Sequence, residues 1–138
     1  MTIAVEPRRP VFTCPRTVDL CVVELCRAAR RGICAIPAYC FMPDHVHMFI
    51  QATHQDADAW LTIVEFKRTT SQRLSDGSEM VRWQPGCHVS VPDSAGGVDA
   101  VCAYVWNNPV RAGLVTDWRD YRFSGSLALG GVGGCEIH

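Results

Sequence analysis

The eight-residue stretch Pro43-Asp44-His45-Val46-His47-Met48-Phe49-Ile50 carries the main structural signal of the sequence. Its Pro-Asp pair is typical of a turn, and the residues that follow alternate as they do in a strand. Successive side chains of a strand point to opposite faces, so His45 and His47 should share one face of a sheet. The apolar side chains between and after them should pack behind that face. Two imidazoles held in this way are well placed to bind one metal ion.

The histidine pair alone is weak evidence for a metal site. A His-hydrophobic-His sequence occurs by chance in many proteins, and a buried histidine is usually a core residue with its nitrogens hydrogen-bonded. On this pattern alone, both interpretations of His45 and His47 stay open.

A second candidate group lies in the segment Tyr104-Val105-Trp106-Asn107-Asn108-Pro109. If the segment is helical, Tyr104 and Asn108 lie on the same face, because residues four apart are neighbours on a helix. Tyrosine can act as a covalent nucleophile, although its ordinary pKa of about 10 means that it needs help at neutral pH. A metal ion that neutralises a scissile phosphate would provide that help. The alternative is an ordinary helix tyrosine that covers the core.

Length and composition predict a globular chain. With 138 residues, 48% of them hydrophobic and 20% charged, we expect one α+β domain over residues 1–129 and a flexible glycine-rich tail over 130–138. No apolar run approaches the length of a membrane span, and the first ten residues lack the apolar stretch of a secretory signal. We therefore expect no membrane partner and a cytoplasmic location.

Periodicity and turn signals predict the order of the elements. A first helix should cover residues 17–31, with Thr17 as its N-cap and Gly32 as its stop. The next two strands should pair antiparallel, over 33–42 and 45–51. The remaining predicted elements are a helix over 56–74, a short strand around 87–91 and a helix over 98–108 that Pro109 ends.

The overall charge does not favour a nucleic-acid-binding protein. The net charge is −1, whereas phosphate binding usually leaves a basic surface. All but one of the thirteen cationic residues are arginines, which suit bidentate phosphate contacts, although a GC-rich genome gives the same bias. The eight cysteines show no Cys-x-x-Cys spacing, so we expect reduced thiols, mostly in the core.

The run Tyr39-Cys40-Phe41-Met42-Pro43-Asp44-His45-Val46-His47 resembles the signature of the single-tyrosine HUH transposases of the insertion-sequence 200-like class. It is most similar to the branch associated with repetitive extragenic palindromes (REP). The resemblance extends from about residue 10 to residue 126, through four more blocks in the family's order. These are Phe66-Lys67-Arg68, Trp83-Gln84-Pro85-Gly86, Tyr104 through Val115, and Tyr121 through Ser126.

The resemblance implies a ferredoxin-like α+β fold, in which helices pack on an antiparallel central sheet. It also implies an endonuclease and strand transferase that cuts single-stranded DNA near hairpins, uses Mg²⁺ or Mn²⁺ and forms a 5′-phosphotyrosine. His45 and His47 match the family's metal ligands, Tyr104 matches the nucleophile, and Asn108 matches a polar residue that can complete the metal site.

The same resemblance suggests where DNA would bind. The candidates for phosphate contacts are Lys67, Arg68, Arg73 and Arg111, and the candidate for base stacking is Trp83. A solvated helix face and a core aromatic are the alternatives for these residues.

Two features depart from the family pattern. Few residues precede Pro10-Val11-Phe12-Thr13, so the first strand is a stub around residues 2–5, or a homodimer supplies it, or the true start lies upstream. After Trp83-Gln84-Pro85-Gly86 the family commonly has an aromatic residue and then His-Asp-His, where this chain has Cys87-His88-Val89.

These departures keep two other functions open. One is a catalytically decayed or domesticated single-stranded-DNA-binding protein. The other is a small zinc hydrolase that adds His54, His88 or Cys87 to the histidine pair, although no His-Glu-x-x-His motif is present to supply a base.

Overall fold

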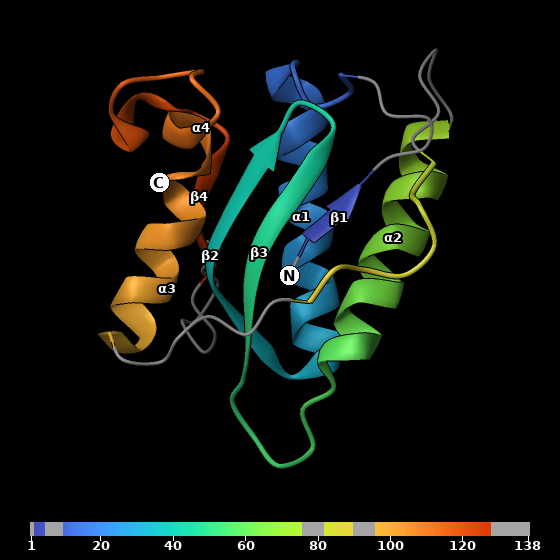
Figure 1. Cartoon of the computed structure of the whole chain (residues 1–138). Helices are drawn as coiled ribbons and strands as arrows, with labels where there is room; N and C mark the ends of the chain where they lie inside the picture. Colours follow the sequence, from blue (N-terminus) through green and yellow to red (C-terminus); the bar gives the residue numbers. More distant parts are fainter. Residues whose placement is uncertain (1, 5–9, 76–81, 90–95, 128–138) are drawn as a thin grey trace.

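The computed structural model describes residues 2–4, 10–75, 82–89 and 96–127, so the predicted tail over 130–138 lies outside the described residues. The elements, in chain order, are β1 (Thr2–Ala4), α1 (Pro15–Gly32), β2 (Cys34–Met42), β3 (His45–Ala52), α2 (Ala59–Ser75), α3 (Gly97–Trp106), α4 (Asn108–Arg111), the 3₁₀ helix η2 (Trp118–Asp120) and β4 (Ser124–Leu127). Figure 1 shows the sheet at the centre, with α2 and α3 on opposite sides of it.

The sheet has the order β1-β3-β2-β4, and every neighbouring pair is antiparallel. An isolated bridge between Thr2 and His88 adds the segment around His88 outside β1. If the segment around His88 is counted as a strand, the sheet has the strand order of a ferredoxin-like fold. Strand β4 is then an extra strand beside β2. The expected α+β fold with an antiparallel sheet is therefore confirmed. The structure has a short first strand, Thr2–Ala4, where the sequence suggested a stub.

The two faces of the sheet carry two separate cores. The larger core lies between the sheet and helices α1 and α2, and it contains Val46 and Met48 from β3. The smaller core lies between the sheet and α3, where Cys40 of β2 packs with Cys102 and Val105. His45 and His47 point away from the larger core because residues alternate along β3. The sequence prediction of this alternation is correct.

Helix α1 begins earlier than the sequence suggested. Its first residue is Pro15, so Thr17 is not the N-cap. Proline suits the first turn of a helix, because the backbone N–H that it lacks would have no partner there. At the other end Gly32 is the last helical residue, and Ile33 takes the left-handed conformation, with φ 56°. A Cβ on Gly32 would lie 2.0 Å from Thr62 Oγ1, so this glycine is needed for the contact between α1 and α2.

The central strand β2 contains Pro37, which has no N–H to donate. The pairing register shifts at this position toward both neighbouring strands, as a bulge allows. Beyond the bulge the register is regular and places His47 opposite Cys40.

Pro109 does not end the helical region, contrary to the sequence prediction. Helix α3 ends at Trp106, and the chain then enters the short helix α4 with Pro109 in its first turn. Proline is tolerated there for the same reason as at the start of α1. The predicted strand around 87–91 reduces to the bridge at His88, and residues 90 and 91 lie outside the described part.

Most of the described cysteines match the expectation of core thiols. Cys21, Cys34, Cys40 and Cys102 are buried and form no disulfide. Cys14 is exposed and Cys87 half-buried, and Cys26 is disulfide-bonded, so the expectation that all the cysteines are reduced is wrong for Cys26. None of the helices in the described part of the chain has the length and apolar character that a membrane span requires.

Candidate metal and nucleophile site

The histidine pair converges on one point in front of the sheet. The Nε2 atoms of His45 and His47 lie 3.1 Å apart, and the two rings are nearly perpendicular, at 83°. Both side chains are partly buried. The turn Pro43-Asp44 and the ladder between β2 and β3 hold the two residues in this register.

Each histidine has a second partner on its Nδ1 atom. Nδ1 of His45 is 2.6 Å from Asp44 Oδ1, and Nδ1 of His47 is 2.9 Å from Thr2 Oγ1. If Nδ1–H donates to these oxygens, both Nε2 lone pairs face the same point. Such partners fix the tautomer and the orientation of metal-binding histidines.

The surroundings keep His47 neutral. Burial lowers its pKa to about 4, and the charges of His45 and Arg111 add to this effect. A neutral imidazole is the form that binds a metal ion.

The residues present fit a divalent cation. Two nitrogen ligands of one small divalent cation, each about 2.1 Å from it, are on the order of 3 Å apart. The 3.1 Å between the two Nε2 atoms is close to this separation. If neither Nε2 carries a proton, the two lone pairs repel at this distance, and a cation between them would remove the repulsion.

Asn108 could supply a further ligand through its side-chain oxygen. Its amide nitrogen donates to the carbonyl oxygens of Tyr104 and Val105, at 3.3 and 3.0 Å, and so caps the end of α3. These bonds leave Oδ1 as the atom of this side chain that could coordinate an ion.

Tyr104 stands out among the three tyrosines of the chain, because 55% of its side chain is exposed. The Arg111 guanidinium carbon lies 4.1 Å from the centre of its ring, and Arg111 Nη2 also donates to the Tyr104 carbonyl oxygen at 2.8 Å. These contacts tie the end of α3 to α4 and restrict the position of the ring.

The other two tyrosines are not available for attack on a substrate. Tyr39 is 1% exposed in the larger core, where burial raises its pKa to about 12. The hydroxyl of Tyr121 donates to the Phe41 carbonyl oxygen at 2.6 Å, and burial raises its pKa as well. A phenol with a raised pKa is a poorer source of phenolate.

Arg111 connects the tyrosine with the histidines. Its charge helps to lower the pKa of His47. Burial raises the pKa of Cys40, which lies opposite His47 in the sheet, and the charge of Arg111 partly offsets that rise. Helix α3 packs on Cys40, which lies opposite His47 on the same face of the sheet, so α3 with Tyr104 and the histidine pair are on the same side of the sheet.

The cations predicted on α2 all have partners within the protein. Lys67 donates to the carbonyl oxygens of Gln84, at 2.9 Å, and Gly86. Arg68 Nη2 is 2.8 Å from Glu65, and Arg73 Nε is 3.4 Å from the buried Glu24. Arg68 and Arg73 are half-exposed, so a phosphate could still reach them.

Trp83 lies in the larger core, which is the alternative that the sequence left open. Only 8% of it is exposed, and its indole N–H donates to Thr70 Oγ1 at 2.9 Å. Its ring stacks on Phe12 and also contacts Phe66. A base could not stack on this ring without displacing one of them.

The third ligand of the zinc alternative is not found. Among the residues that the structure describes, no three His, Cys, Asp or Glu side chains come together in a way that could hold a metal ion. His54 lies beyond the far end of β3 and pairs with Asp56 instead.

Two residues of the site, Thr2 and Asp44, were not predicted from the sequence to be partners of the histidines. Asp44 directly precedes His45, so the motif itself contained that signal. Thr2 gave no local signal, because it reaches His47 only through the pairing of β1 with β3.

Comparisons with known proteins identify the family and a similar fold. A family model described as "Transposase IS200 like" matches residues 1–108. A solved structure of a REP-associated tyrosine transposase bound to a REP hairpin is similar in fold, with a TM-score of 0.70 and 21% sequence identity. The similarity covers 89% of this chain and 72% of that chain. A comparison with curated proteins found no match.

Proposed function

The chain belongs to the IS200-like transposase family, and on that basis we propose that it cuts and rejoins single-stranded DNA near hairpins through a covalent bond to Tyr104. The observation that carries the proposal is the position of Tyr104. It is the exposed tyrosine of the three, and its helix α3 packs on the face of the sheet that carries the histidine pair. The similar structure with a bound REP hairpin supports hairpin DNA as the substrate class.

The proposed reaction is a transesterification at phosphorus. The phenolic oxygen of Tyr104 forms a bond to the phosphorus, and the bond from phosphorus to the 3′ oxygen breaks. The phenol gives up its proton, and the departing 3′ oxygen takes one up, so a 3′-hydroxyl and a 5′-phosphotyrosine result. Attack of another 3′-hydroxyl on the phosphotyrosine reverses these steps and joins a new strand.

In this proposal His45, His47 and Asn108 hold a Mg²⁺ or Mn²⁺ ion. When bound, the ion would neutralise charge on the scissile phosphate and orient its oxygens. Two imidazole nitrogens and one amide oxygen suit Mn²⁺ better than Mg²⁺, which prefers oxygen ligands. Asp44 and Thr2 orient the two imidazoles from behind.

The experiment that tests the proposal uses labelled single-stranded oligonucleotides that form a hairpin with a randomised stem and flanks. The full chain is incubated with them and Mn²⁺, and denaturing electrophoresis then separates protein that carries covalently bound label. We expect a labelled protein band that requires the metal and that protease treatment removes. A protein that binds the oligonucleotides but forms no such band would be the decayed DNA-binding protein instead.

We expect the affinity for single-stranded DNA to depend strongly on salt. If Arg68, Arg73 and Arg111 contact phosphates, binding should weaken roughly tenfold between about 50 and 200 mM salt because counterions are released. Replacing Arg68 by Gln should flatten the slope of log K against log salt by about 0.7. Fluorescence anisotropy measures both, with Arg30→Gln on α1 as a control of equal charge change. A flat salt dependence in the unchanged protein would argue against a phosphate-binding surface.

We also expect Thr2 to contribute to metal affinity. Thr2→Val removes the hydroxyl that contacts His47 Nδ1 while it keeps a β-branched side chain in β1. Loss of such a partner typically weakens metal binding about 10- to 100-fold, and Thr2→Ser should restore it. Electron paramagnetic resonance of free Mn²⁺ measures the affinity without any DNA. Equal affinity in the Val variant would show that the hydroxyl does not orient His47.

A further inference from the structure

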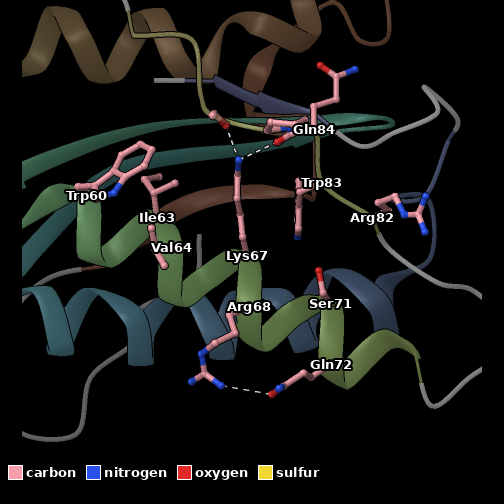
Figure 2. Close-up of a pocket in the computed structure, with 12 residues that line it drawn as sticks. Trp60, Ile63, Val64, Lys67, Arg68, Ser71, Gln72, Arg82, Trp83 and Gln84 are labelled. Carbon is pink, nitrogen blue, oxygen red and sulfur yellow. Dashed lines mark hydrogen bonds between the residues drawn. The ribbon is translucent and has the colours of Figure 1, made fainter.

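A groove of about 630 Å³ lies between α2 and the segment from Arg82 to Gly86. It is separate from the histidine site, because α2 packs on the opposite face of the sheet from α3. Figure 2 shows Trp60 toward one end of the groove, Arg82 toward the other and Lys67 between them. The volume falls within the roughly 300–1,000 Å³ of sites that bind small ligands.

The wall of this groove is fixed by contacts within the protein. The ammonium group of Lys67 donates to two carbonyl oxygens of the segment, those of Gln84 and Gly86. Trp83, next to them, anchors the segment in the larger core through Phe12 and Thr70. The groove therefore exists before any ligand arrives, which lowers the entropic cost of binding.

The lining combines an exposed aromatic ring with positive charge. Trp60 is 58% exposed, and Val64, one turn along α2, is exposed beside it. Lys67, Arg68 and Arg82 also line the groove, and the lining residues within the described part of the chain include no carboxylate. Glu65, which does not line the groove, forms a salt bridge with Arg68. The exposed Arg82 forms no salt bridge with any residue in the described part of the chain.

We propose that this groove binds an unpaired segment of the DNA substrate, with a base stacked on Trp60 and phosphates at Arg82 and Arg68. A flat exposed indole between cations fits an unstacked base on a polyanionic strand. The proposal rests on the proposed function, since that function supplies single-stranded DNA as the substrate.

The test uses oligothymidylate of twenty nucleotides in the presence of EDTA, with Tyr104→Phe in every variant. Neither cleavage nor the metal can then affect the result. Trp60→Ala should weaken binding roughly tenfold, because stacking of a base on an aromatic side chain is worth that much in affinity. The control Val23→Ala, on the exposed face of α1, should bind like the parent protein. Arg82→Gln should weaken binding more than Arg30→Gln, although both remove one charge.

Tryptophan fluorescence gives a second, local readout. Trp60 is the most exposed of the four tryptophans, so oligothymidylate should quench the emission of the parent protein and not that of Trp60→Phe. The Phe variant keeps a ring and should bind more tightly than the Ala variant.

Three results would overturn the proposal. The first is equal affinity of Trp60→Ala and the parent protein for oligothymidylate. The second is quenching that persists in Trp60→Phe. The third is a dimer in analytical ultracentrifugation that Trp60→Ala converts to a monomer, because the groove would then be a contact between two copies of the chain. None of these results bears on Tyr104 as nucleophile.

Discussion

Replacing Tyr104 by Phe should reduce DNA cleavage by on the order of 10³-fold or more while folding and DNA binding persist. The change removes one oxygen from a side chain that is 55% exposed, and the ring stays available to Arg111. Water at the same place would lack the positioning that the helix gives the phenol. Cleavage is measured by release of the labelled 5′ fragment, which ends in the new 3′-hydroxyl, from a hairpin oligonucleotide selected in the labelling experiment.

Tyr121→Phe is the matched control for this substitution. It also removes one hydroxyl, which in this case donates to the Phe41 carbonyl oxygen. We expect a loss of about 1 kcal/mol in the free energy of unfolding and little change in cleavage. If Tyr104→Phe cleaved as fast as this control, the proposed nucleophile would be wrong.

The second large effect is expected from His47→Ala. This substitution removes one of the two Nε2 atoms that converge at 3.1 Å, so metal-dependent cleavage should fall by at least about a hundredfold. Binding of the uncleaved oligonucleotide should change little, because phosphate contacts come mainly from arginines. Single-turnover cleavage assays over a series of Mn²⁺ concentrations, together with anisotropy, separate the two effects.

His54→Ala serves as the control for His47→Ala. His54 is exposed beyond the far end of β3 and interacts with Asp56, so its loss should leave cleavage unchanged. Full metal-dependent activity in His47→Ala would exclude His47 as a metal ligand. Loss of DNA binding in the same variant would mean that His47 contributes to binding or folding and not specifically to metal-dependent cleavage.

The sequence predicted the parts of the fold that local patterns determine. Alternation along residues 45–51 placed His45 and His47 on one face, and the structure has the apolar residues between and after them packed on the other. Strand β4 was not predicted, because Ser-Gly-Ser-Leu has little strand propensity and is held by its pairing with β2. Pro109 was assigned as a helix end, because sequence alone does not distinguish a stop from the first turn of a new helix.

The site shows the same division between local and long-range information. The motif around His45 also contains Asp44, whereas Thr2 reaches His47 through strand pairing that no local pattern encodes. The base-stacking candidate was chosen from the family block around Trp83, but packing buries that ring and leaves Trp60 exposed. Whether Trp60 or Trp83 faces solvent depends on the tertiary contacts of α2, and these contacts cannot be predicted from composition.

The identity of the residue that becomes joined to DNA tests the central claim most directly. After incubation with the selected hairpin oligonucleotide and Mn²⁺, the covalent complex is digested with protease and nuclease, and the modified peptide is sequenced by mass spectrometry. The proposal predicts one modified peptide, with a nucleotide attached through a 5′-phosphate to the oxygen of Tyr104. A nucleotide on Tyr39 or Tyr121, or cleavage that leaves no tyrosine modified, would contradict it.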